Sequence, residues 1–425
     1  MRISLHQRRG NQGSILFVAL IISIVIGMSM AGYLTVIAGQ QRSVMRSQKW
    51  NAALDLAEAG IEEGLAQANA SPNDFSVNSW GVNNGTNYGP VIRSLSGGTY
   101  GVCIKGSNTP TIYATGCITA PLTSTVMTRT IRVTTQVLPL FNVALGAVGN
   151  INMNGNSMAT DSWNSHSTNL SNNGVYTSTK ISTNGDVASQ QGIVNIGNHT
   201  IDGNLYLGPT ATYTSSTNLI LGDLDKNYNV NFPDARLPAS AATAINPTVN
   251  AGTNYLNSNG QTYFVNNDNK PIVVPAGITV TLIVYAQSFN PTSITLGGGM
   301  TNPATLIVYD APTSPGGSVT LGGNNVGGAI SATPVNFIFY GLPNLSTINF
   351  HGTSDFIGAI YAPEADLTLG GGGNGNNLMG AAICKTVTLN GHYDVHYDEA
   401  LANWGPAKSF TANSWQELNN NGGFF

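Results

Sequence analysis

Apolar residues form one unbroken block near the start of the chain. Ser14 to Gly39 are 26 consecutive residues without a charge. A helix needs about 20 apolar residues to span a bilayer, and the apolar part of a cleaved secretory signal has only about 7–15. The block therefore predicts a transmembrane helix over residues 14–39. Arg2, Arg8 and Arg9 precede it, and because cytoplasmic flanks are rich in basic residues, we expect the rest of the chain to lie outside the inner membrane.

Helical spacing continues beyond this block. No proline occurs before Pro72, and apolar residues recur at intervals of three and four, as on one face of a helix. This stripe comprises Trp50, Leu54, Ala57, Ile61, Leu65 and Ala68. The pattern predicts one long helix over residues 14–70, half in lipid and half leading to a soluble domain. A plain single-pass anchor and a subunit that leaves the bilayer for a helical bundle both fit it.

Residues 71–140 have the texture of a small antiparallel sheet. Loop residues come first, and three β-branched runs follow at 99–105, 111–119 and 128–137, a pattern typical of short strands. Cys103 and Cys117 lie on the first two runs. They are candidates for a cross-strand disulfide, which an extracytoplasmic compartment permits, or else small buried groups. Cys384 lies in an apolar run and is expected in a core.

From Phe141 onward, two kinds of short apolar run repeat. Runs such as Leu282–Tyr285 and Leu306–Tyr309 are 24 residues apart, and Ile294–Leu296 and Val319–Leu321 are 25 apart. Repetition on this scale indicates a solenoid. We expect a parallel β-helix over residues 141–402, with a C-terminal strand and tail at 403–425. A Greek-key sandwich is the alternative, since strand periodicity alone does not fix closure.

The fold class expected is therefore an α+β N-terminal module followed by a mainly β domain. The composition fits a β-rich domain outside the cytoplasm, because only 8% of residues are charged and 50 are glycine. The glycines lack the three-residue period of collagen, which excludes a collagen-like chain. The net charge of −4 offers no basic footprint for nucleic acid. No motif requires a cofactor, and glycine-rich segments lack the ending of a phosphate-binding loop.

Two segments of the long helix resemble a known family. Gly13-Ser14-Ile15-Leu16-Phe17-Val18-Ala19-Leu20 and Ala57-Glu58-Ala59-Gly60 are similar to the N-termini of the type IV pilin superfamily, and within it to PilX-type minor pilins. The resemblance implies a pilin-like module, a leader at residues 1–13 and cleavage by a prepilin peptidase between Gly13 and Ser14. Gly10 is an alternative cleavage position. The implied partners are other pilins, reached through this helix, and the implied location is the inner membrane and then a surface filament.

Val18 departs from the family pattern. Major pilins carry glutamate at this position, and the carboxylate neutralises a neighbour's N-terminal ammonium; here no acid occurs before Asp55. Burying an unpaired ammonium is costly, so this chain should not add readily beneath another copy. We therefore expect a position at the tip of a filament.

The C-terminal half is similar to an uncharacterised β-solenoid domain that is attached to PilX-type N-termini in bacterial surface proteins. The segments that carry this likeness are 356–363, 367–373, 392–401 and 414–418. The likeness implies a surface protein and names no ligand.

Candidate chemistry in this half is sparse. Acids are scattered through the regular coils, without the paired carboxylates that glycoside cleavage needs, so no catalytic residue is assigned. His392, Asp394, His396 and Asp398 alternate along one strand, which places them on one face. They are weak candidates for metal ligands, and a hydrogen-bonded cap of the last coil is the favoured interpretation.

Taken together, these patterns predict a non-enzymatic filament subunit that displays a solenoid for adhesion, with a glycan or another surface as ligand. The alternatives are a subunit that primes filament assembly and a membrane-anchored enzyme that degrades polysaccharide.

Overall fold

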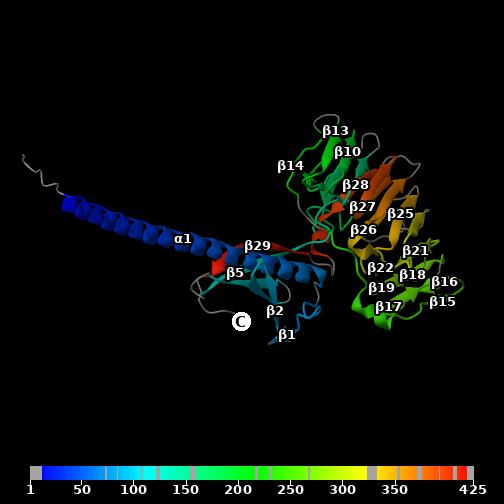
Figure 1. The fold of residues 1–425 in the computed structure, drawn as a ribbon. Helices are drawn as coiled ribbons and strands as arrows, with labels where there is room; N and C mark the ends of the chain where they lie inside the picture. Colours follow the sequence, from blue (N-terminus) through cyan, green and yellow to red (C-terminus); the bar gives the residue numbers. More distant parts are fainter. Residues whose placement is uncertain are drawn as a thin grey trace, which may run out of the picture. The chain divides into compact units, whose positions relative to one another are not determined.

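The computed structural model describes most of the chain, namely residues 12–71, 74–83, 85–106, 109–120, 125–153, 159–215, 219–228, 232–266, 269–322, 333–351, 355–370, 376–391, 393–404 and 409–418. The chain divides into two compact units. We call Met1–Gln136 with Phe410–Phe425 the anchor module, and Val137–Ser409 the solenoid. One long helix is followed by a mainly β region with a large parallel sheet (Figure 1), which confirms the expected fold class.

The long helix, α1, spans Gln12–Ala70. Its 59 residues correspond to about 88 Å at 1.5 Å per residue. Helix-forming Ala, Leu, Glu and Gln are frequent in its second half. It ends just before Pro72, because a proline disfavours helical backbone at the residue that precedes it. The single continuous helix predicted from the apolar spacing is confirmed.

The anchor module contains a six-stranded sheet in the order β1-β2-β3-β4-β5-β29. Its strands are β1 (Val82–Asn83), β2 (Asn87–Leu95), β3 (Gly98–Lys105), β4 (Thr111–Thr119), β5 (Val126–Leu138) and β29 (Ser409–Leu418). The meander β3-β4-β5 is antiparallel and matches the three predicted runs. Strand β2 occupies a segment that was expected to be a loop, and β29 comes from beyond the solenoid. The solenoid is therefore an insertion between the last two strands of this sheet.

Small residues let α1 approach the sheet closely. Ala53 and Ala57 are fully buried, and a Cβ added at Gly60 would lie 2.8 Å from the Cβ of Ala114. The apolar stripe that begins at Trp50 is thus only partly correct, since Trp50 is 47% exposed while Ala57 is buried. Close packing of helix backbone on a sheet selects the smallest side chains rather than the most apolar ones.

The solenoid winds through two series of strands. The first series comprises β6 (Leu145–Ala147), β7 (Ile151–Met153), β8 (Ala159–Trp163), β9 (Val187–Ser189), β10 (Ile193–Gly197), β11 (Thr200–Ile201), β12 (Leu205–Leu207), β13 (Thr212–Ser215) and β14 (Leu224–Asp225). The second comprises β15 (Thr248–Asn250), β16 (Thr253–Tyr255), β17 (Thr262–Val265), β18 (Ile272–Val274), β19 (Thr279–Val284), β20 (Ser288–Phe289), β21 (Ile294–Leu296), β22 (Thr305–Asp310), β23 (Gly317–Gly322), β24 (Phe337–Gly341), β25 (Leu345–His351), β26 (Phe356–Gly370), β27 (Asn376–Asn390) and β28 (Tyr393–Asp398). Short 3-10 helices lie at η1 (Ala239–Thr243), η2 (Pro334–Asn336) and η3 (Glu399–Asn403).

The coils of the second series contribute to three columns of stacked parallel strands, whereas the repeats suggested two strand types. One column runs through β22, β24 and the middle of β26, a second through β23, β25 and the end of β26, and a third through β16, β18 and β21. The expected alignment of Ile294 with Val319 is wrong, because Ile294 pairs with Ile272 in the third column and Val319 with Phe289 in the second. Val319 does stack in one column with Leu367 and Val387, through Ile348.

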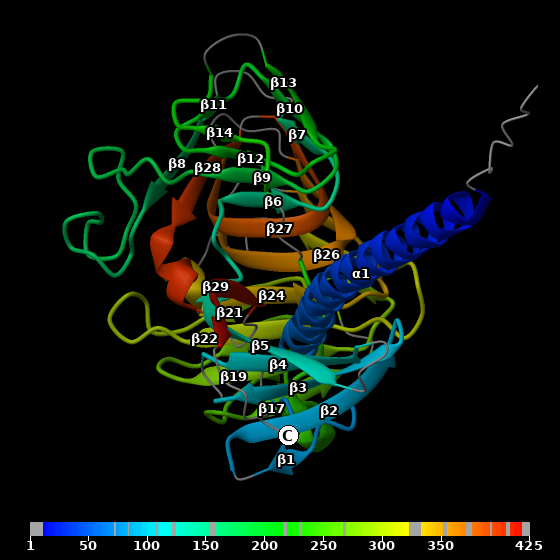
Figure 2. The ribbon, with the colours of Figure 1, turned by 60° about the vertical axis from the view of Figure 1, so that its left-hand side comes forward.

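The order of coils in space differs from their order in sequence. The first series begins at β6 and proceeds away from it through β9 and β12 to β14. The second series ends at β27 and β28, which pair with β6, β7 and β8 of the first. Figure 2 shows β6 lying directly beside β27, with β9 and β12 beyond it. The chain thus enters and leaves the solenoid at the same point within the stack.

Stacked side chains hold successive coils together. Tyr309 and Tyr340 are paired on adjacent strands, and their ring centroids are 4.8 Å apart, the usual spacing between strands. On the turns, Asp and Asn side chains accept hydrogen bonds from the backbone of the next coil: Asp186 Oδ1 from Asn204 N at 2.7 Å, and Asn204 Oδ1 from Asp223 N at 2.8 Å. These hydrogen bonds satisfy backbone N–H groups on the turns, which gives the abundant Asn side chains a structural role.

Candidate functional site

The first half of α1 is an exposed apolar surface. Every large apolar side chain described from Ile15 to Val36 is at least 45% exposed, which is far more than an isolated soluble domain leaves open to water. Of the described part of the chain, this helix alone is long and apolar enough to cross a membrane. Its surface requires lipid or protein around it.

The processing position predicted from the sequence lies at the start of this helix. Gly13 and Ser14 belong to its first turn, and residues 1–11 lie outside the described part of the chain. Val18 is 52% exposed on the apolar surface. A glutamate at this position would be available to a neighbouring helix, and valine offers that neighbour only apolar contact.

The cross-strand disulfide prediction is wrong. Cys103 pairs with Tyr113, and Cys117 pairs with Thr99. The two cysteines are thus displaced by four residues along adjacent strands, or about 14 Å, whereas a disulfide requires Cα atoms within about 7 Å. Both are free thiols. Burial raises the pKa of each thiol, which keeps them protonated and unreactive.

A polar network surrounds His396 on β28. His396 Nδ1 lies 2.6 Å from Asp161 Oδ1 on β8, and Nε2 lies 3.3 Å from Asn377 Oδ1 on β27. The Tyr176 ring stacks on the imidazole with centroids 3.8 Å apart, and its hydroxyl donates to Asp161 Oδ2 at 2.8 Å. Burial, followed by the hydrogen bond to Asp161 and its charge, raises the pKa of the Tyr176 hydroxyl. Both imidazole nitrogens are occupied, so the network is closed to a ligand.

The two aspartates of the predicted cluster accept hydrogen bonds from backbone N–H groups. Asp394 Oδ1 accepts from Ala159 N at 2.8 Å. Asp398 is fully buried, and one of its oxygens accepts from Ser165 N at 2.9 Å and Ala400 N at 3.1 Å. Burial raises the pKa of the Asp398 carboxyl, and these hydrogen bonds oppose that shift. His392 lies outside the described residues.

These side chains do not cap the end of the solenoid. Strand β28 lies between β27 and β8, so further coils stack on the strand that was expected to close the domain. The polar side chains instead join the last coil of the second series to the first coil of the first. Within the described ranges, no group of three or more His, Cys, Asp or Glu residues is arranged to hold a metal ion.

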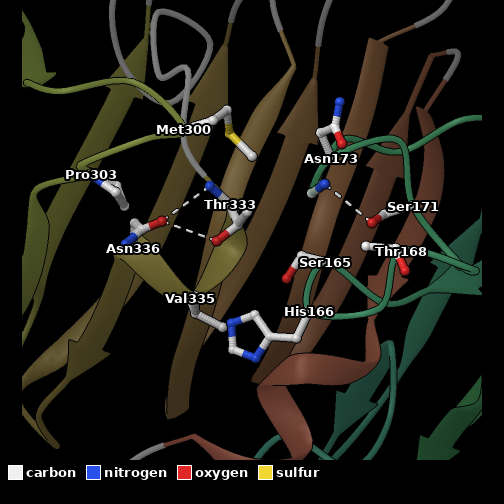
Figure 3. A pocket seen from close by; sticks show the side chains of 11 residues that line it. Ser165, His166, Thr168, Ser171, Asn173, Met300, Pro303, Thr333, Val335 and Asn336 are labelled. Carbon is white, nitrogen blue, oxygen red and sulfur yellow. Dashed lines mark hydrogen bonds between the residues drawn. The ribbon is translucent and has the colours of Figure 1, made fainter.

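A pocket lies beside this network, under the 164–186 loop that connects β8 to β9. Its volume is about 310 Å³. Figure 3 shows Thr168 and Asn173 of the loop on one side and Met300 and Pro303 on the other, with His166 extending toward Val335. We call this the loop pocket. Sequence reasoning missed it, because the loop follows no repeat and its position depends on the stacking of distant coils.

Comparisons with known proteins assign no activity. A family profile described as a domain of unknown function (DUF7305) matches residues 243–404, a range that contains all the strands of the second series. No curated protein sequence matches the chain. Among solved structures, the chain is similar to the competence-associated pilin ComZ from Thermus thermophilus, with 12% identity, a TM-score of 0.28, and coverage of 87% of this chain and 97% of that one. This likeness is too remote to bear on function.

Proposed function

We propose that the chain is a minor pilin-like subunit that displays its solenoid at the tip of a type IV pilus or related filament, for adhesion. The observation that carries the proposal is the 59-residue helix, whose first half is apolar and exposed and whose second half packs on a small antiparallel sheet. Such a helix can leave lipid for a bundle of like helices without losing apolar contact. The pilin-like segment around Gly13 and the inserted solenoid support the same interpretation.

Mass spectrometry of the native protein tests the processing step. We expect a mature chain that begins at a methylated Ser14, released by a prepilin peptidase. An intact Met1 would contradict entry into the pilus pathway and would leave a membrane-anchored solenoid. A peptidase-deficient strain is the control, since it should accumulate only the unprocessed chain.

Deletion of the gene separates adhesion from assembly. If the chain is a tip adhesin, the deletion strain keeps a normal number of filaments by electron microscopy and loses attachment. Loss of the filaments themselves would instead favour a priming role. Normal filaments with normal attachment would refute adhesion.

The proposed position at the filament tip rests on the absence of a glutamate at Val18, so a substitution of Val18 tests it. A Val18→Glu variant supplies the carboxylate that the helix lacks before Asp55. We expect immunogold labelling to move from filament ends to positions along the shaft, because a neighbour's ammonium is then neutralised rather than buried unpaired. Val18→Gln is the matched control, as it is similar in size and uncharged. Shaft labelling already present in the wild type would refute the tip position.

A further inference from the structure

The loop pocket has walls of two chemical kinds. Met300, Pro303 and Val335 supply apolar surface. The loop supplies His166, Thr168 and Asn173, which are all exposed. Among the described residues, none of these three side chains is engaged in a hydrogen bond, so their polar groups are available to a ligand. A hydroxyl, an amide and an imidazole can each both donate and accept.

Among the described residues that line the pocket, none is Lys, Arg, Asp or Glu. Apart from the His166 imidazole, this lining offers a charged ligand no countercharge for the hydration that it loses, which is unfavourable. The ligand that fits is uncharged, carries several hydroxyl or amide groups, and has an apolar face for Met300 and Val335. A volume of about 310 Å³ is at the lower end of small-molecule sites, which suits one or two sugar rings.

The loop is held in place before any ligand arrives. Lys180 Nζ donates to the carbonyl oxygens of Thr168 and Ser171, at 2.9 and 2.7 Å. Ser162 and Ser182 exchange backbone hydrogen bonds at the base of the loop, and Tyr176 is stacked on His396. A preformed wall lowers the entropy cost of binding.

We propose that the loop pocket binds an uncharged saccharide, with Thr168 and Asn173 bonding its hydroxyl groups and Met300 and Val335 contacting its C–H face. The proposal rests on the adhesive function inferred above and names the class of ligand and the site. A neutral sugar meets each requirement, because its ring has a hydroxyl edge and an apolar face.

Binding of the detergent-solubilised full chain to an array of neutral and acidic glycans tests the site. We expect binding to neutral glycans, and at least tenfold weaker binding by Thr168→Trp, whose indole fills the pocket from an exposed position. Ser178→Trp is the matched control: it places an indole at an exposed residue of the same loop outside the pocket, and it should bind as the wild type does. Binding to acidic glycans only, binding to none, or equal binding by the Thr168→Trp variant would overturn the proposal.

Attachment assays in cells distinguish failure of the site from failure of the function. Loss of attachment in both the deletion strain and the Thr168→Trp strain supports the loop pocket as the adhesive site. Loss in the deletion strain alone shows that adhesion uses another surface and overturns the pocket. Normal attachment in both refutes the adhesive function itself.

Discussion

Gly116 is the position where the packing of α1 on its sheet allows the least change. It lies in β4, and a Cβ added there would overlap the carbonyl oxygen of Ala53 and approach Ala57 N to 2.7 Å. The backbone of Gly116 is not left-handed, so an alanine would adopt it without strain. A Gly116→Ala substitution therefore tests steric contact alone.

The expected cost is large because both contacted atoms belong to the helix backbone. Overpacking a core usually costs about 1–3 kcal/mol, and flexible side chains relieve part of it. Here the helix must move away from β4, which also opens the close contact between Gly64 and Ile112. We expect the anchor module to lose about 3 kcal/mol of unfolding free energy, or a factor of about a hundred in its folding equilibrium.

Hydrogen exchange measured by mass spectrometry on the full chain resolves the two units. Amides of β4 should exchange about a hundredfold faster in Gly116→Ala, while amides of β26 and β27 should be unchanged. Gly39→Ala is the control, since a Cβ there meets nothing within 4 Å and alanine favours helix. Unchanged exchange in β4 would refute the packing argument, and equal acceleration in both units would refute its local origin.

Three further predictions concern stability. The side-chain oxygens of Asp310 have no hydrogen-bond partner in the described chain, and burial raises the pKa of this carboxyl to about 8. The native state then holds a proton that the unfolded state releases near pH 4. Denaturant titrations should therefore show the unfolding free energy of the solenoid falling by about 1.4 kcal/mol per pH unit from pH 4 to 8. Asp310→Asn should remove this slope, and a slope that persists would assign it to other groups. His396→Ala should cost the solenoid about 1–3 kcal/mol in urea unfolding, because Asp161 loses its buried partner; an unchanged midpoint would show that water replaces the imidazole. The Asn69 side chain forms two hydrogen bonds with the backbone of Phe410, accepting from its N–H at 2.6 Å and donating to its carbonyl at 3.1 Å. Asn69→Ala should therefore speed amide exchange in β29 about tenfold. An unaltered exchange rate would show that these two hydrogen bonds do not stabilise β29.

The predictable parts of the fold are those that depend on neighbours in sequence. A 26-residue apolar block and an uninterrupted helical period predict α1, since both reflect backbone geometry and solvent alone. The strands β3, β4 and β5 follow from β-branched runs for the same reason. Where close packing decides, prediction fails: the buried face of α1 is set by Gly60 and Gly64, whose lack of a side chain gives no signal in an apolar pattern.

The solenoid shows a second limit. Repeats predict stacked coils, because each coil needs another to cover its apolar face, but they do not predict the exact register between neighbouring strands. The runs Leu306–Tyr309 and Phe337–Tyr340 align residue for residue in the structure, whereas Leu282 pairs with Val308. A displacement of two residues keeps the same side chains inward, so the apolar pattern cannot detect it.

The polar cluster on β28 shows why the candidate site could not be read from the sequence. Alternation places Asp394, His396 and Asp398 on one face, and that much is local. Their roles depend on β8, which is more than 200 residues away in the sequence. There His396 bonds to the Asp161 side chain, and Asp394 accepts a hydrogen bond from the backbone of Ala159. From the sequence alone, the last strand of the repeats is interpreted as a cap, because nothing in the repeat pattern indicates that β8 pairs with it. Because the first coil of the domain stacks on the last, these side chains lie inside the stack and connect two coils instead of closing its end.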